Sequence, residues 1–224
     1  AVRSCGLDRT IPSRRAPTDR PTRRGIEGLK NLARHPDATV LADENRIIRD
    51  TGLVVGGSLL LALSAQISIS LWFTPVPITG QTLGVLLVGA ALGSRRGALA
   101  IVLYLIEGGF GLPFFAGGDS GWVAFSGPTG GYLIGFVVAA YVVGWMAERG
   151  WDRRFWTAAV AMLAGEFLIY LFGVPWLAYI VGAGDALPLG MFPFIPGDIA
   201  KLVVAALVLP STWSLVGPQH PPPN

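Results

Sequence analysis

Charged residues are scarce in most of this chain. Residues 1–50 hold eleven Lys or Arg and seven Asp or Glu, whereas residues 51–224 hold only six and seven. A soluble globular domain carries about 25% charged residues, so the longer segment cannot cover itself with a water-facing surface in the usual way. This scarcity excludes an ordinary soluble enzyme and predicts an integral membrane protein that begins with a polar tail.

Cysteine and histidine are also nearly absent. The chain has one cysteine, Cys5, and two histidines, His35 and His220, which both lie in the polar flanks. A single cysteine allows no intrachain disulfide and no cysteine metal site. Residues 51–224 have a net charge of −1, six basic minus seven acidic, so they offer no basic face to nucleic acid. We therefore expect no cofactor, no metal site, no catalytic residue and no nucleic-acid partner.

Apolar segments separated by turn residues fill residues 51–216. They do not alternate apolar and polar residues as the strands of a membrane barrel would, so the expected fold class is an all-α membrane protein with six transmembrane helices. We expect a disordered polar extension at 1–45, a six-helix membrane domain at 46–215 and a proline-rich tail at 216–224. The predicted helices lie at about 52–72, 81–94, 97–112, 129–147, 156–182 and 197–213.

The arginines that flank these helices predict the orientation of the domain. Seven of them precede the first helix or fall in alternate connections, and the intervening loops 73–80, 113–128 and 183–196 contain no Lys or Arg. Basic residues concentrate on the cytoplasmic side of membrane proteins, which predicts six spans with both termini in the cytoplasm. The seven are Arg46, Arg49, Arg95, Arg96, Arg149, Arg153 and Arg154.

Four ionisable residues fall inside the predicted spans: Glu107, Glu166, Asp198 and Lys201. Each costs roughly 2.5–3.5 kcal/mol at mid-span, so each needs a partner or a wet cavity. Asp198 and Lys201 are three residues apart and therefore share one face of a helix. They either form an ion pair that only neutralises itself or offer an acceptor and a cation to a ligand from the outer side, and we favour the ligand. Glu107 and Glu166 are expected to be structural, with Glu166 protonated or hydrogen-bonded within the bundle.

Two outer loops add turn residues to the same side. The first loop carries the prolines of 74–82, which cannot continue either helix, and the second carries six glycines within 117–131. Backbone N–H groups at a glycine-rich helix entry can approach a polar ligand closely. We expect this side to hold the binding site.

Specific motifs extend over about residues 52–215. They are 65–69 (AQISI) running into 74–83 (TPVPITGQTL), 127–136 (GPTGGYLIGF), 169–177 (IYLFGVPWL) and 196–201 (PGDIAK). In this order they resemble the BioY family, the biotin-binding S components of energy-coupling factor transporters. The resemblance implies biotin uptake through a six-helix subunit that binds the vitamin near its outer face, under the loop between the first two helices. It implies no enzymatic activity.

The resemblance also implies the site residues. The Asp-x-x-Lys pair of the last helix, Asp198 and Lys201, is implicated in binding biotin, and the other candidates come from the same motifs on the outer side. A carboxylate tail suits Lys201 and ureido N–H groups suit Asp198, although the sequence leaves open which end of biotin meets which charge. The candidate substrate-binding residues are Asp198, Lys201, Thr79, Gln81, Gly130, Gly131, Tyr132 and Trp176.

The expected partners follow from a missing motif. Both lysines of the chain, Lys30 and Lys201, lack the preceding glycine of an ATP-binding phosphate loop. The resemblance therefore implies a transmembrane coupling subunit and ATP-binding subunits in the plasma membrane. Two alternatives stay open: an S component for another small vitamin, and an intramembrane enzyme that uses Glu107, Glu166 or Asp198. A purely structural scaffold would tolerate apolar residues at Asp198 and Lys201.

Overall fold

The computed structural model describes residues 36–216 and the side chains of residues 44–212. The predicted extension at 1–45 and tail at 216–224 therefore lie mostly outside the described residues. The chain divides into two units, Ala1–Arg46 and Ile47–Asn224, and the second contains the structures discussed below.

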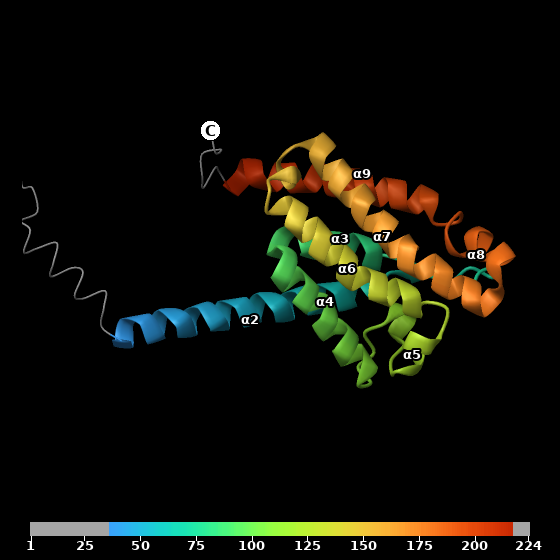
Figure 1. Ribbon diagram of the computed structural model, residues 1–224, viewed down its shortest axis with the longest axis horizontal. Coiled ribbons are helices and arrows are strands. Elements are labelled where there is room, and N and C mark those ends of the chain that lie inside the picture. The colour runs from blue at the N-terminus through green and yellow to red at the C-terminus, as the bar shows by residue number, and fades with distance from the viewer. Residues whose placement is uncertain (1–35, 217–224) are drawn as a thin grey trace, which may run out of the picture. The chain divides into compact units, whose positions relative to one another are not determined.

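Helices make up nearly all of the described chain (Figure 1). Four helical stretches are long and apolar enough to cross a membrane, namely Glu44–Gln66, Gly130–Ala147, Phe155–Val181 and Ile195–Thr212. The predicted helical class is thus confirmed. The long helices are α2 (Pro36–Gln66), α3 (Gln81–Leu92), α4 (Ser94–Gly109), α6 (Gly130–Ala147), α7 (Phe155–Val181) and α9 (Ile195–Val216). The short ones are η1 (Ala116–Gly118), α5 (Val123–Ser126), η2 (Trp151–Arg153) and α8 (Ala183–Gly190).

The first helix differs from its predicted bounds, since α2 starts at Pro36 and stops at Gln66 rather than near 52 and 72. A short antiparallel hairpin follows it, in which β1 (Ser68–Ile69) pairs with β2 (Ile78–Thr79). Gly80 N–H also donates to the Ile67 carbonyl at 2.9 Å. Prolines at 75 and 77 block a helix in this segment, and the hairpin pairing satisfies the backbone groups that the helix would have used.

The centre of the bundle is α6, which packs against α3, α4 and α7 (Figure 1). Three glycines from neighbouring helices meet there. A Cβ on Gly89 of α3 would lie 2.7 Å from the Ala140 carbonyl oxygen of α6, and one on Gly97 of α4 would lie 2.9 Å from Gly89 Cα. A Cβ on Gly144 of α6 would likewise meet the backbone of Gly93 and Ser94. Small residues let membrane helices approach closely, and these three glycines allow α3, α4 and α6 to do so here.

Polar contacts hold the helices together at one end of the bundle. Arg96 at the start of α4 forms an ion pair with Asp50 of α2 at 3.0 Å. Glu148, just after α6, accepts hydrogen bonds from the backbone N–H and hydroxyl of Ser94 at 2.7 and 2.9 Å. The arginine-bearing connections between α3 and α4 and between α6 and α7 therefore lie at this same end, which we call the basic end.

The other end of the bundle gathers the hairpin, α8 and the start of α9. The hydroxyl of Thr74 donates to the Leu189 carbonyl at 2.6 Å, and Tyr132 at the start of α6 donates to the Gly190 carbonyl at 2.8 Å. These bonds attach α8 both to the loop between the strands and to the central helix. The candidate site lies beneath them.

Candidate functional site

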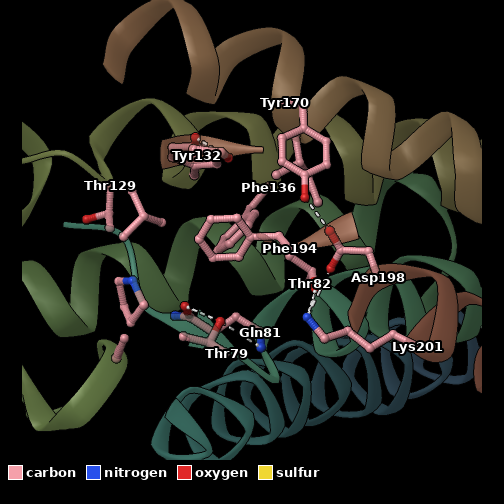
Figure 2. A pocket seen from close by; sticks show the side chains of 15 residues that line it. Thr79, Gln81, Thr82, Thr129, Tyr132, Phe136, Tyr170, Phe194, Asp198 and Lys201 are labelled. Atoms are coloured by element: carbon pink, nitrogen blue, oxygen red, sulfur yellow. Dashed lines mark hydrogen bonds and ion pairs between the residues drawn. The ribbon is translucent and has the colours of Figure 1, made fainter. Parts of the chain in front are cut away.

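A cavity of about 60 Å³ lies among the hairpin, α3, α6, α7 and the start of α9 (Figure 2). We call it the inner compartment. Five of the predicted site residues line it: Thr79, Gln81, Tyr132, Asp198 and Lys201. Segments that are far apart in sequence thus bring these side chains around one cavity.

The inner compartment contains a cluster of charged and hydroxyl groups. Lys201 Nζ lies 3.1 Å from Asp198 Oδ1 and donates to the Thr82 hydroxyl at 3.0 Å. The hydroxyl of Tyr170 donates to the other carboxylate oxygen of Asp198 (Figure 2). Asp198 is buried, with 7% of its surface exposed. Each charge of the buried pair therefore has a second polar partner, as a charge removed from water requires.

The local sequence of α9 explains why the pair lies here. Pro196 falls in the first turn of the helix, where its missing N–H costs nothing. Asp198 follows in that turn, near the positive end of the helix dipole, and its N–H donates to the Phe194 carbonyl at 2.9 Å. Lys201 comes three residues later on the same face. The two side chains share the helix face that the spacing predicts, and they form an ion pair.

Thr79 and Gln81 form a second polar group on the opposite wall. The Thr79 hydroxyl donates to Gln81 Oε1 at 3.1 Å and accepts the Gln81 backbone N–H at 3.3 Å. Gln81 Nε2 in turn donates to the hydroxyl of Tyr104 on α4, which donates to the Phe114 carbonyl at 3.2 Å. This chain of bonds fixes the Gln81 side chain where the hairpin passes into α3.

Aromatic and aliphatic side chains close the rest of the wall. Phe136 of α6 and Phe194 before α9 lie between the two polar groups (Figure 2). Tyr132 and Tyr170 meet edge to face, with ring centroids 6.4 Å apart. An apolar pocket with a few fixed polar groups is typical of a site for a small organic ligand.

A second and larger space, the outer compartment, adjoins the first. It has a volume of about 340 Å³ and shares Pro77, Gln81, Ala116 and Thr129 with the inner compartment. Its walls come from the proline-rich hairpin and from the glycine-rich segment before α6. The charged side chain in its lining is Asp119. The two outer loops singled out in the sequence thus meet around the outer compartment, next to the inner one.

Three of the predicted site residues lie outside both compartments. Trp176 Nε1 donates to the Gly127 carbonyl at 2.9 Å. A Cβ on Gly130 would collide with the Phe125 carbonyl, and one on Gly131 would collide with Trp176 itself. Gly130, Gly131 and Trp176 therefore form a packing contact between α6 and α7 that supports the glycine-rich loop. This contact holds the glycine-rich loop at the edge of the outer compartment.

Three further residues of the inner compartment were not predicted from the sequence: Tyr170, Thr82 and Phe194. Tyr170 and Thr82 both lie within the motifs quoted above. Their residue types alone gave no reason to prefer them, because the register of α7 and α3 against α9 decides which side chains face Asp198 and Lys201.

The two glutamates expected to be structural lie away from the cavity. Glu107 of α4 accepts a hydrogen bond from the buried Ser58 hydroxyl of α2. Glu166 of α7 is buried behind the inner compartment, where it lines a separate apolar groove. Neither side chain lines the inner or the outer compartment.

Comparisons with known proteins identify relatives of the chain. A family model described as the BioY family matches residues 34–218. A Rhizobium etli protein named "Biotin transporter BioY" is 41% identical over 159 residues, which cover 67% of this chain and 85% of that protein. A Pyrococcus horikoshii protein named "Probable biotin transporter BioY" is 40% identical over 160 residues, covering 71% of this chain and 93% of that protein.

A solved structure shows a similar fold. It is described as the crystal structure "of the S-component for biotin from an ECF-type ABC transporter", and it matches with a TM-score of 0.64 and 23% sequence identity. The match covers 76% of this chain and 93% of that one. The protein is thus an integral membrane protein with an S-component fold. Given the matches of the family model and of the relatives, the chain belongs to the BioY family.

Proposed function

We propose that the protein is the membrane-embedded S component of a biotin uptake transporter, and that it binds biotin in the two joined compartments. The observation that carries this proposal is the cluster of Asp198, Lys201, Tyr170 and Thr82 in an otherwise apolar cavity at one end of the bundle. The names of the relatives support the choice of ligand.

Biotin combines chemical groups that suit both compartments. Its ureido ring and its carboxylate each need polar partners, and its thioether ring and methylene chain need apolar surface. The inner compartment supplies a carboxylate and an ammonium group 3.1 Å apart. At about 60 Å³ it is too small to enclose the whole vitamin, so the remainder occupies the adjoining space of about 340 Å³.

We further propose six spans with both termini in the cytoplasm, in the plasma membrane. Arg96 pairs with Asp50, and Glu148 accepts from Ser94, so the arginine-bearing connections lie together at the basic end. Basic residues favour the cytoplasmic side, which supports this orientation. The cavity lies at the opposite end and then faces outward. At 1.5 Å per residue, α3 is about 18 Å long, so the hairpin at its start completes that crossing.

The protein acts with other subunits rather than as an enzyme in this proposal. A transmembrane coupling subunit and ATP-binding subunits of an energy-coupling factor module supply the energy. The absence of a phosphate-binding loop from the sequence supports a division of labour in which this chain binds the vitamin.

Binding of labelled biotin to the purified protein in detergent tests the proposal. We expect saturable binding that unlabelled biotin displaces and that other vitamins do not. Ligand at a hundred times its dissociation constant should stabilise the fold by about 2.7 kcal/mol, so biotin should also raise the melting temperature. If only a different vitamin stabilises the protein, that vitamin is its substrate. Covalent conversion of biotin would favour the alternative of an intramembrane enzyme.

A further inference from the structure

Glu166 is a buried acid whose carboxyl group forms no hydrogen bond with the described residues. Only 6% of its surface is exposed, and neither carboxyl oxygen has a hydrogen-bond partner in the part of the chain that the structure describes. It lines a groove of about 460 Å³ between α7, α8 and α9 whose other lining residues are almost all apolar. Tyr170 and Asp198 line this groove as well as the inner compartment, so Glu166 lies directly behind the wall of the ligand cavity.

The charges near Glu166 do not balance if it is ionised. Glu166 is close enough to Asp198 and Lys201 of α9 to interact electrostatically with both. The same helix carries Tyr170, and Tyr132 of α6 lies next to Tyr170. Leu187 of α8 and Met191, just after α8, also line the groove but do not titrate. Two carboxyl groups thus share one ammonium group. With both ionised, the cluster would hold one unpaired negative charge away from water, which is costly.

The hydrogen bonds indicate which carboxyl group is neutral. Asp198 accepts hydrogen bonds from Tyr170 and from Lys201, so a negative charge on Asp198 has two partners. Glu166 accepts from no described group. We therefore place a proton on Glu166, which removes the unpaired negative charge from the cluster.

We propose that Glu166 is a proton-binding site linked to the ligand cavity, such that an anionic ligand binds more tightly when Glu166 is protonated. An ionised Glu166 would repel the ligand carboxylate and compete with it for Lys201. Linkage is reciprocal, so the bound anion in turn favours protonation of Glu166. Above the pH at which the ligand's own carboxyl group ionises, affinity is then full while Glu166 is protonated and falls as pH rises through the titration of Glu166, by at most about tenfold per pH unit for one proton.

The test measures biotin affinity as a function of pH. It rests on the proposed function only for the choice of biotin as the ligand. We compare the unmodified protein with Glu166→Gln and with Glu107→Gln, which changes the other glutamate inside the predicted spans. Glu166→Gln should keep its affinity over the pH range in which the unmodified protein loses it, and Glu107→Gln should follow the unmodified protein. Lys201 and the tyrosines of the cavity are unchanged in all three proteins, so any effect they have on the profile is common to the three. Coinciding profiles for Glu166→Gln and the unmodified protein would overturn the linkage.

A second measurement tests the proton site without ligand. Infrared spectra of the ligand-free protein should show the C=O band of a protonated carboxyl group, which Glu166→Gln removes and Glu107→Gln leaves in place. A band that Glu166→Gln does not change would overturn the proposal. If no biotin binds at any pH, the proposed function and the linkage both fail, whereas the band still decides whether Glu166 carries a proton.

Discussion

The hydroxyl of Tyr170 on α7 donates to the carboxylate of Asp198 on α9, across 28 residues of sequence. The same carboxylate is the ion-pair partner of Lys201. Tyr170 therefore fixes the orientation of the acceptor that the binding site offers, and it also separates the ligand cavity from the groove that contains Glu166.

Replacing Tyr170 by Phe should weaken biotin binding by about tenfold to a hundredfold. The ring and its packing stay, but Asp198 loses the donor that fixes its carboxylate. A charge-assisted hydrogen bond from the ligand to Asp198, of about 1.5–3 kcal/mol, is then misaligned. Equilibrium binding measures the loss. Tyr179→Phe is the matched control, because Tyr179 lies on the same helix with 87% of its surface exposed. Equal affinities for the two variants would show that the hydroxyl of Tyr170 does not orient the site.

Removing both charges of the α9 pair should separate stability from binding. Lys201→Met alone should cost about one to two decades of biotin affinity, since a charge-assisted hydrogen bond disappears. It also leaves Asp198 buried without its cation, which lowers stability. The double variant Asp198→Asn plus Lys201→Met has no unpaired charge, so its melting temperature should recover while its affinity stays low.

Both quantities must come from the same preparations, with Val204→Ala as a control on the exposed face of α9. Recovery of affinity together with stability would mean that the two charges only neutralise each other. A loss of affinity in Val204→Ala as large as that in Lys201→Met would instead indicate general destabilisation of α9.

Cysteine labelling should show which end of the bundle faces outward. In a Cys5→Ser background, cysteines at Asp119 and Asp185 should react with an impermeant reagent added to intact cells. A cysteine at Trp151 should react only after the membrane is permeabilised. Trp151 is preferable to Gly150, whose φ of +83° disfavours a side chain. Labelling of position 151 in intact cells would contradict the proposed orientation.

The same substitution at two glycines should have opposite effects on stability. Gly89→Ala places a Cβ 2.7 Å from the Ala140 carbonyl oxygen, and such overpacking costs about 1–3 kcal/mol. Gly56→Ala meets no atom within 4 Å and should stabilise α2 by up to about 1 kcal/mol through helix propensity. Melting temperatures of the purified variants without ligand measure both effects. A fall for Gly56→Ala as large as that for Gly89→Ala would contradict the packing argument.

Much of the fold could be predicted because apolar runs between turn residues decide helices in a membrane protein. The predicted span 129–147 matches α6, and 156–182 matches α7, each to within about a residue at either end. The end of α2 was predicted six residues too late, at 72 instead of Gln66. That error arose because hydropathy does not distinguish a helix from the hairpin that Ser68 and Ile69 form with residues 78–79.

The site could be predicted where its residues are close in sequence. Asp198 and Lys201 have a helical spacing of three, and Thr79 and Gln81 flank a single turn, so local patterns place each pair together. Tyr170 could not be found in this way, because its bond to Asp198 depends on how α7 is rotated against α9. Nor does the sequence alone tell that Trp176 packs over Gly131 instead of facing the cavity.

The contact of Gly89, Gly97 and Gly144 also determines where the bundle is stiff. Where backbones are in direct contact, no side chain can change its rotamer and almost no free volume remains. The separation of α3, α4 and α6 is therefore nearly fixed toward the basic end. The cavity end is lined by side chains and attached to α8 by single hydrogen bonds from Thr74 and Tyr132. Any change of shape that admits a ligand is therefore confined to that end, and the arginine-bearing connections keep their spacing whether the cavity is empty or filled.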